Sequence, residues 1–225
     1  MRTYQLPDER LAAFYEAVKR AHQEGEGRQR GHDLLHDVTV GEHALLIAPN
    51  NRVGLMAWVA AFCHSQDYLV EPRKDPGAFA VRICELLGHV PREMFSADEL
   101  DDIADAALRH GEKNAEGQSM VQQTLQDADR LANLMLGVVF RIGQGYPALP
   151  AIELEYLKDV NPASTYAEPR SCADDLRNCM SEYEPQFRLP AAKTLGKTYL
   201  LDLRSYLAVL EGQYDRLLNL AGLTL

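Results

Sequence analysis

The sequence predicts an all-α protein, and three observations support that fold class. Apolar residues recur at three- and four-residue spacing in most segments, which is the pattern of a helix with one buried face. Proline, glycine, serine and aspartate stand at the ends of these segments, where helices start and stop. Alternation of apolar and polar residues never extends over more than a few positions, so strands are not expected. The length of 225 residues suits a single domain, residues 1–225.

The first three predicted helices follow directly from this spacing. Apolar residues predict a first helix over residues 11–24, which glycines close. A second helix covers residues 34–47 and stops before Pro49. A third covers residues 51–68 and is apolar nearly all round. We therefore expect the third helix to be the central buried one.

Three further helices are predicted before residue 145. The fourth covers residues 79–87 and ends at a glycine. The fifth begins with Ser96 and Glu99, which form a capping-box pattern, and runs to His110. The sixth covers about residues 120–136.

The last third of the chain has a different composition. Residues 143–190 are rich in proline, glycine and polar residues, which predicts long loops or an insertion. Residues 191–220 then predict one long C-terminal helix with several tyrosines. This helix could serve to form a homo-oligomer.

Composition narrows the classes of partner. The chain has 23 Lys and Arg residues against 33 Asp and Glu residues, a net charge of −10. Because phosphate-backbone binding needs clustered cations, this balance argues against nucleic-acid binding. It leaves room for a small anionic substrate, since a pocket needs only a metal ion or a few local cations. With no apolar signal region and no run of about 18 apolar residues, we expect a cytoplasmic protein without membrane binding.

The second and third predicted helices each contain a cluster of polar residues that includes a histidine. His36 shares a helix face with apolar residues, where it is either a satisfied core histidine or a metal ligand. His64 comes at the end of the strongly apolar third helix, followed by a burst of polar residues. These groups either reach solvent at a plain helix end or are buried. Burial would require them to be paired or bound to metal.

The sixth helix carries two acids far from either end. Aspartate is a poor residue for a helix interior, and Asp127 shares a face with Leu131 and other core candidates. A carboxylate on that face needs a partner, and a metal ion is the simplest one. The alternative is an ion pair at the surface, in which Asp127 or Asp129 pairs with Arg130.

Taken in order, these clusters resemble the HD-domain metal-dependent phosphohydrolase superfamily. The family's first block is Asp-x-x-His, which is similar to Asp33 through His36. Its second is Ala-Ala-x-x-His-Asp on an apolar helix, matched by residues 60–64 up to the histidine. Its last is Asp-Ala-Asp-x-Leu, which residues 127–131 contain intact. The resemblance covers about residues 30–145.

This resemblance implies an HD-type helical bundle in which His36, His64 and Asp127 bind a divalent metal ion. Such a mixed nitrogen and oxygen set suits Mn, Fe, Co, Ni or Zn, and Mg where carboxylates dominate. The implied activity is hydrolysis of a small phosphate ester, with a nucleotide as one candidate.

The chain departs from the family at one position. The family has an aspartate directly after the second histidine, and this chain has Ser65. Three interpretations stay open. Asp67 substitutes as a ligand, since residues three apart share a helix face. Alternatively, a water held by Ser65 fills the place, or the metal site is weakened and catalysis is lost. Where Asp67 is not a ligand, it is a candidate to transfer protons.

Other residues receive supporting roles. His110, at the end of the fifth helix, is a second candidate for proton transfer, although a helix end also favours a cation without any catalytic role. Arg109 and Arg130 are candidates to neutralise a phosphate. Asp33 is expected to orient His36 or a neighbouring backbone group.

Two functions follow from these assignments. The first is a metal-dependent phosphohydrolase. The second is an HD-fold ligand-binding or regulatory module with weakened catalysis, because Ser65 replaces the family's aspartate. An all-α scaffold whose polar clusters are ion pairs is a third and weaker hypothesis.

Overall fold

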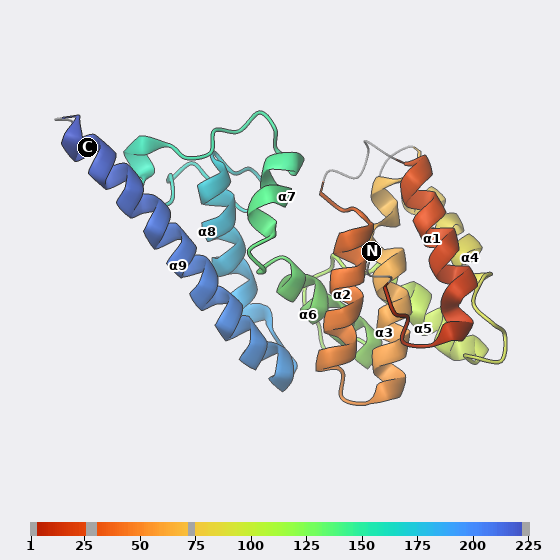
Figure 1. Ribbon diagram of the computed structural model, residues 1–225. Coiled ribbons are helices and arrows are strands. Elements are labelled where there is room, and N and C mark those ends of the chain that lie inside the picture. Colours follow the sequence, from red (N-terminus) through yellow and green to blue (C-terminus); the bar gives the residue numbers. More distant parts are fainter. Residues whose placement is uncertain (1–3, 26–30, 72–74, 222–225) are drawn as a thin grey trace. The chain divides into compact units, whose positions relative to one another are not determined.

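The computed structural model describes residues 4–25, 31–71 and 75–221, and every regular element in these ranges is helical (Figure 1). The all-α prediction is therefore confirmed. No helix in the described ranges is both long and apolar enough to cross a membrane. The chain divides into two compact units, the first ending at Asp129 and the second beginning at Arg130.

The first unit is built mainly from α-helices. Two 3₁₀ helices, η1 and η2, lie directly before α1 and directly after α3. The elements are η1 (Glu9–Leu11), α1 (Ala12–Glu24), α2 (Leu34–Ile47), α3 (Asn51–His64), η2 (Ser65–Tyr68), α4 (Pro76–Leu87), α5 (Ala97–Leu108) and α6 (Met120–Ala132), which continues past the boundary.

Side-chain caps explain where these helices begin. Asp33 accepts a hydrogen bond from the backbone N–H of His36, and Asn50 accepts one from Val53, so that each satisfies a backbone donor in the first turn. The predicted capping box of Ser96 and Glu99 is present at the start of α5. The third predicted helix is shorter than expected. It ends at His64, and the chain tightens into 3₁₀ geometry in η2.

The core of the first unit surrounds α3, as predicted. Trp58 and Phe62 of α3 are fully buried, and Phe14 of α1 packs against both rings, with centroids 6.2 and 6.4 Å away. Gly41 lets α2 approach α3 closely, because a Cβ there would meet Trp58 and Phe62 at 3.0 Å. This close packing places the first turn of α2 beside the last turn of α3.

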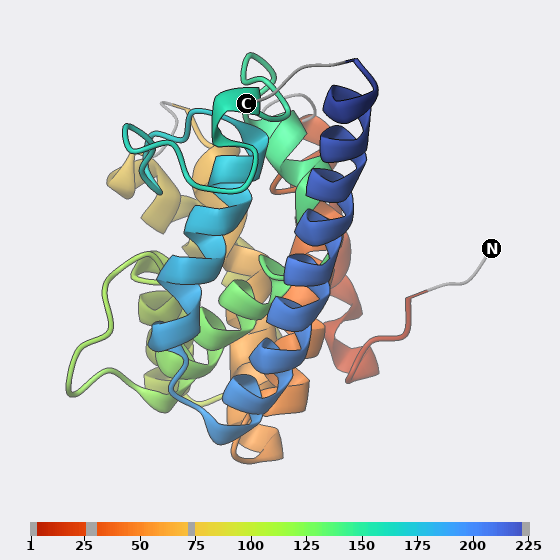
Figure 2. The ribbon, with the colours of Figure 1, turned by 90° about the vertical axis from the view of Figure 1, so that its left-hand side faces the viewer.

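The second unit contains more helix than the sequence predicted. Residues 143–190 were expected to form loops, but they include α8 (Cys172–Tyr183). Two features explain why this segment is helical. Ser171 caps its N-terminus, and an apolar stripe that includes Leu176 and Met180 is buried. The predicted C-terminal helix is confirmed as α9 (Pro190–Leu220), and α8 runs alongside it (Figure 2). The remaining elements are α7 (Val138–Gly145), η3 (Leu154–Tyr156) and η4 (Glu184–Gln186).

Candidate metal centre

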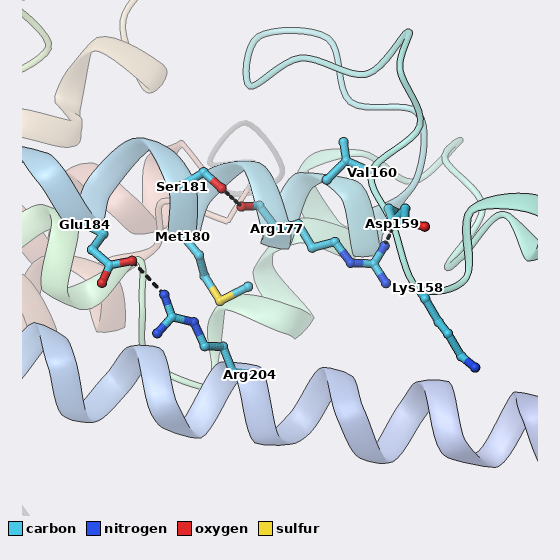
Figure 3. A pocket seen from close by; sticks show the side chains of 8 residues that line it. All are labelled: Lys158, Asp159, Val160, Arg177, Met180, Ser181, Glu184 and Arg204. Carbon is cyan, nitrogen blue, oxygen red and sulfur yellow. Dashed lines mark hydrogen bonds and ion pairs between the residues drawn. The ribbon is translucent and has the colours of Figure 1, made fainter.

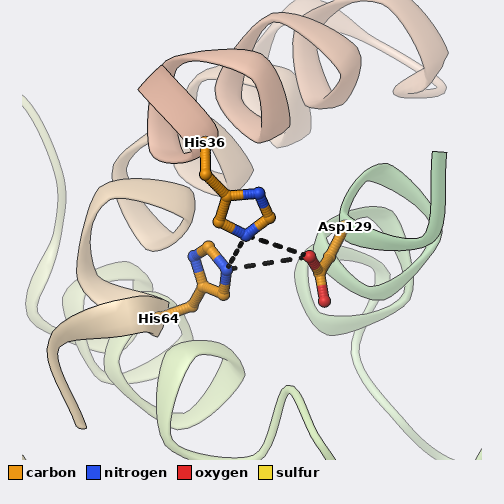
Figure 4. Close-up of side chains that lie close together, drawn as sticks. All are labelled: His36, His64 and Asp129. Atoms are coloured by element: carbon orange, nitrogen blue, oxygen red, sulfur yellow. Dashed lines mark hydrogen bonds and ion pairs between the residues drawn. The ribbon is translucent and has the colours of Figure 1, made fainter. Parts of the chain in front are cut away.

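Three side chains from three helices of the first unit converge on one point (Figure 4). The Nε2 atoms of His36 and His64 lie 3.2 Å apart. The Oδ1 atom of Asp129 lies 3.3 Å from Nε2 of His36 and 3.8 Å from Nε2 of His64. Both histidines are buried, whereas the Asp129 side chain is 23% exposed. Among the described residues, these three form the group of His, Cys, Asp and Glu side chains that could hold a metal ion.

Local structure fixes the two histidines. His36 lies in the first turn of α2, where Asp33 caps the helix by accepting the His36 backbone N–H at 3.0 Å. His64 is the last residue of α3, and its Nδ1 donates to the carbonyl oxygen of Ala61 at 2.5 Å. That bond leaves Nε2 of a neutral His64 as the acceptor that faces the other two groups. Asp33 thus contacts the backbone of His36 as a helix cap, and its orienting role in a metal site stays a prediction.

The donor set fits a divalent ion. Ligand atoms about 2.1 Å from an ion lie about 3.0 Å apart in octahedral geometry and about 3.4 Å apart in tetrahedral geometry. The separations of 3.2 and 3.3 Å match this range, and 3.8 Å is slightly longer. Two imidazole nitrogens at 3.2 Å also need a proton or a cation between them, because two lone pairs facing each other repel. Three protein ligands with positions left open is a pattern typical of catalytic metal sites.

The electrostatics of Asp129 agree with a cation-binding site. Burial by itself would raise the pKa of Asp129, but its contact with His36 and the neighbouring His64 outweigh burial. Together they hold the pKa of this carboxyl well below its ordinary value. Asp129 therefore carries a negative charge at neutral pH, which is the state that binds a metal.

His110 lies next to the three ligand candidates. Its ring centroid is 5.0 Å from that of His64, and its Nδ1 donates to the carbonyl oxygen of Ala107 at 2.8 Å. Gln126 of α6 holds the same loop by donating to the His110 carbonyl at 2.9 Å. Burial, together with the nearby His64, lowers the pKa of His110 to about 4. His110 is thus neutral at pH 7, with Nε2 as its acceptor atom.

The structure brings Asp129, rather than the predicted Asp127, to the two histidines. Asp127 is fully buried in α6 but is not part of the group. Residues two apart on a helix are about 200° apart around its axis, so only one of these two acids can face His36 and His64. Asp67, one of the alternatives considered for the missing aspartate, lies in η2 and does not join the group either.

The predicted phosphate-binding arginines have other partners. The Arg109 side chain is 47% exposed and forms surface ion pairs with Asp105 at 3.2 Å and Glu112 at 3.0 Å. Arg130 belongs to the second unit, where its Nη1 donates to the carbonyl oxygen of Gln186 at 3.3 Å.

Sequence reasoning gave no role to a buried acid behind the site. Asp37, the residue after His36, is fully buried. Its Oδ2 lies 2.7 Å from Nε2 of His22, and its Oδ1 accepts the Ser65 hydroxyl at 2.6 Å. The Ser65 hydroxyl, considered as a holder for a ligand water, therefore donates to a carboxylate instead. The available signal was the acid at 37 directly after a candidate ligand histidine, since an acid among core residues needs a partner.

The second unit has a cavity of about 300 Å³ beside α8 (Figure 3). Three cations line it, and each already pairs with a carboxylate. The pairs are Lys158 with Asp215 at 2.5 Å, Arg177 with Glu211 at 2.8 Å and Arg204 with Glu184 at 2.6 Å. Arg177 also donates to the backbone carbonyls of Leu157 and Asp159. These cations hold loop and helix together, and their charge is compensated.

Comparison with known proteins shows a likeness of fold. No family model and no curated protein matches the chain. Among solved structures, the chain is similar to a crystal structure of a Lactobacillus plantarum protein, a Northeast Structural Genomics target. The two share 15% sequence identity with a TM-score of 0.65, over 94% of this chain and 100% of that chain. At this identity the likeness concerns the fold alone, so function must be argued from the site.

Proposed function

We propose that this protein is a metal-dependent phosphohydrolase of the HD-domain type that acts on a small phosphate ester. The observation that carries the proposal is the convergence of His36, His64 and Asp129 from α2, α3 and α6. Two imidazoles and a carboxylate suit Mn, Fe, Co, Ni or Zn. The order of these residues along the chain also agrees with the family resemblance, with Asp129 in place of Asp127.

The proposal gives each residue of the site one role. A bound divalent ion supplies Lewis acidity toward a phosphoryl oxygen and lowers the pKa of water. His36 and His64 hold their Nε2 atoms toward the ion's position, and Asp129 contributes the negative charge. Because the Asp129 side chain is 23% exposed, this edge of the site is open to solvent.

His110 is suited to orient a water molecule. Its Nδ1 proton is engaged by Ala107, so Nε2 can accept a hydrogen bond from water beside His64. With a pKa of about 4, His110 does not hold a proton at neutral pH. We therefore expect it to align a water by accepting a hydrogen bond, with proton release to solvent.

A matched pair of histidine variants tests the proposal. His36 and His43 are both buried in α2, but Nδ1 of His43 lies 2.7 Å from the carbonyl oxygen of Thr39, and His43 is outside the metal group. We expect wild-type protein dialysed against Mn²⁺ to retain one ion per chain by elemental analysis. His36→Ala should lose it and His43→Ala should keep it. Metal-stimulated hydrolysis of p-nitrophenyl phosphate and a panel of nucleoside monophosphates should follow the same pattern. Wild-type protein that binds neither Mn²⁺ nor Ni²⁺ at saturation would refute the proposal.

Two observations favour a second candidate, an HD-fold ligand-binding or regulatory module with weakened catalysis. The Ser65 hydroxyl is directed to Asp37, and Arg109 is held in surface ion pairs. Both leave the site with fewer groups for a phosphate than the resemblance implied. This candidate predicts metal and nucleotide binding by calorimetry without turnover of any substrate in the panel.

A further inference from the structure

Asp37 occupies an unusual place behind the metal centre. It is the residue after His36, and Ser65 is the residue after His64. The two side chains meet in a 2.6 Å hydrogen bond in which the Ser65 hydroxyl donates to Oδ1 of Asp37. The hydrogen bond therefore links the two residues that come directly after the two candidate ligand histidines. The bond joins the first turn of α2 to the start of η2.

The lengths of the bonds show how strongly this carboxylate is held. Its contacts of 2.6 Å to Ser65 and 2.7 Å to His22 lie in the range of charge-assisted hydrogen bonds. Asp37 and Ser65 have no exposed surface, and His22 is 4% exposed. Burial of a carboxylate is unfavourable unless it is hydrogen-bonded. The contacts with Ser65 and His22 offset that cost for Asp37.

The same carboxylate lies beside a candidate ligand. Oδ1 of Asp37 is 4.0 Å from Nδ1 of His64, on the side of the ring opposite to the atom that faces Asp129. A negative charge behind an imidazole makes its other nitrogen a better donor to a cation. The bond to Ser65 meanwhile opposes the repulsion that would separate the two Nε2 atoms, which lie 3.2 Å apart.

We propose that Asp37 is a positioning residue of the metal centre. Through its bond to Ser65 it clamps the two ligand histidines at coordinating distance, and it places a buried carboxylate behind His64. This inference rests on the proposed metal site at His36, His64 and Asp129. It assigns Asp37 no contact with the ion or with the substrate.

Two variants with different packing consequences test this role. Asp37→Asn removes the charge and keeps an acceptor for Ser65, and Ser65→Ala removes only the hydroxyl. We expect each to weaken Mn²⁺ binding to the full chain by about 10- to 100-fold, the usual effect of losing a partner behind a ligand histidine. The Co²⁺ absorption bands should shift, because the ligand geometry changes. Asp175→Asn, which alters a buried carboxyl of the second unit, is the matched control and should leave both readouts unchanged.

The double variant separates positioning from a purely structural effect. Asp37→Ala removes both the charge and the acceptor for Ser65. If the pair acts as one clamp, Asp37→Ala with Ser65→Ala should bind Mn²⁺ no more weakly than Asp37→Ala alone, because the bond is already lost in the single variant. Additive losses, or single variants whose affinity stays within threefold of wild type, would overturn the inference. Should Asp37→Asn fail to fold by circular dichroism, Ser65→Ala decides alone. Failure of wild-type protein to bind Mn²⁺ would instead refute the proposed function, so the two failures are distinguishable.

Discussion

The two units arrange their charged groups in different ways. In the second unit, every cation that lines the cavity beside α8 faces a carboxylate within 2.8 Å, so the charges cancel in pairs. In the first unit, two histidine ring nitrogens and a carboxylate oxygen point at each other, and a further carboxylate lies behind them. Complementary pairs stabilise a fold without any ligand. Ring nitrogens and a carboxylate that converge need a shared proton or a cation between them, and such a group can bind a metal ion where a compensated pair cannot.

The largest effect is expected where a further acid is added to the first unit. Ser65→Asp restores the family's sequence pattern, but it places a second carboxylate against Asp37, at a position now 2.6 Å from its oxygen. Like charges buried together without a counter-ion are strongly destabilising. We expect the unfolding free energy to fall by about 4 kcal/mol, measured by urea denaturation of the metal-free protein.

A compensating change should relieve that effect. Adding Asp37→Ser to Ser65→Asp exchanges the two residues and leaves one carboxylate beside one hydroxyl. This double variant should be more stable than Ser65→Asp alone. A Ser65→Asp protein as stable as wild type would show that the first unit has room for another unpaired acid, and the contrast between the units would fail.

The next prediction distinguishes the two acids of α6. Asp129→Asn should weaken Mn²⁺ binding by about 100-fold or more, because a ligand and its charge are lost. Asp127→Asn, the same change two residues away at a fully buried position, should weaken it less than about tenfold. Isothermal titration of both variants measures this, and the reverse ranking would restore Asp127 as the ligand.

These two acids also show what the sequence could and could not predict. Helix starts were predictable because Ser96 and Glu99 signal a capping box locally. The rotation of α6 was not, since it depends on the packing of the whole helix, and Asp127 and Asp129 both resemble core acids. The partnership of Asp37 with His22 and Ser65 escaped prediction for a related reason. It joins α1, α2 and η2 across gaps of 15 and 28 residues, which no local pattern encodes.

In the second unit, removing one member of a compensated pair should cost stability and nothing else. The Arg177 side chain is only 10% exposed and holds Glu211 and two loop carbonyls. Arg177→Met keeps much of the volume and leaves Glu211 without this partner, so we expect a loss of about 3 kcal/mol in a urea titration. The matched readout is Mn²⁺ affinity, which should stay at the wild-type value. Weaker metal binding would indicate that the cavity takes part in the site.

A buried acid in the same unit should give a smaller, pH-dependent effect. Burial raises the pKa of Asp175 to about 6. The folded protein therefore keeps a proton that the unfolded chain has released, and stability falls as the pH rises from about 4 to 6. Asp175→Asn should remove this slope and raise the unfolding free energy at pH 7 by about 1 kcal/mol, allowing for partial solvation. The measurement is the difference between variant and wild-type stability from pH 3.5 to 7.5. A flat difference would mean that Asp175 is solvated.

The smallest effect is expected at the surface of the first unit. Arg109 pairs with Asp105 and Glu112, and all three side chains are about half exposed. Exposed pairs of this kind contribute little and are screened by salt. Arg109→Ala should change the unfolding free energy by less than about 0.5 kcal/mol at 0.15 M salt, with any difference shrinking at 1 M salt. A loss above 2 kcal/mol that persists at high salt would place Arg109 among the buried, compensated pairs. Burial of a charged group, and not the unit in which it lies, would then decide how its charge is compensated.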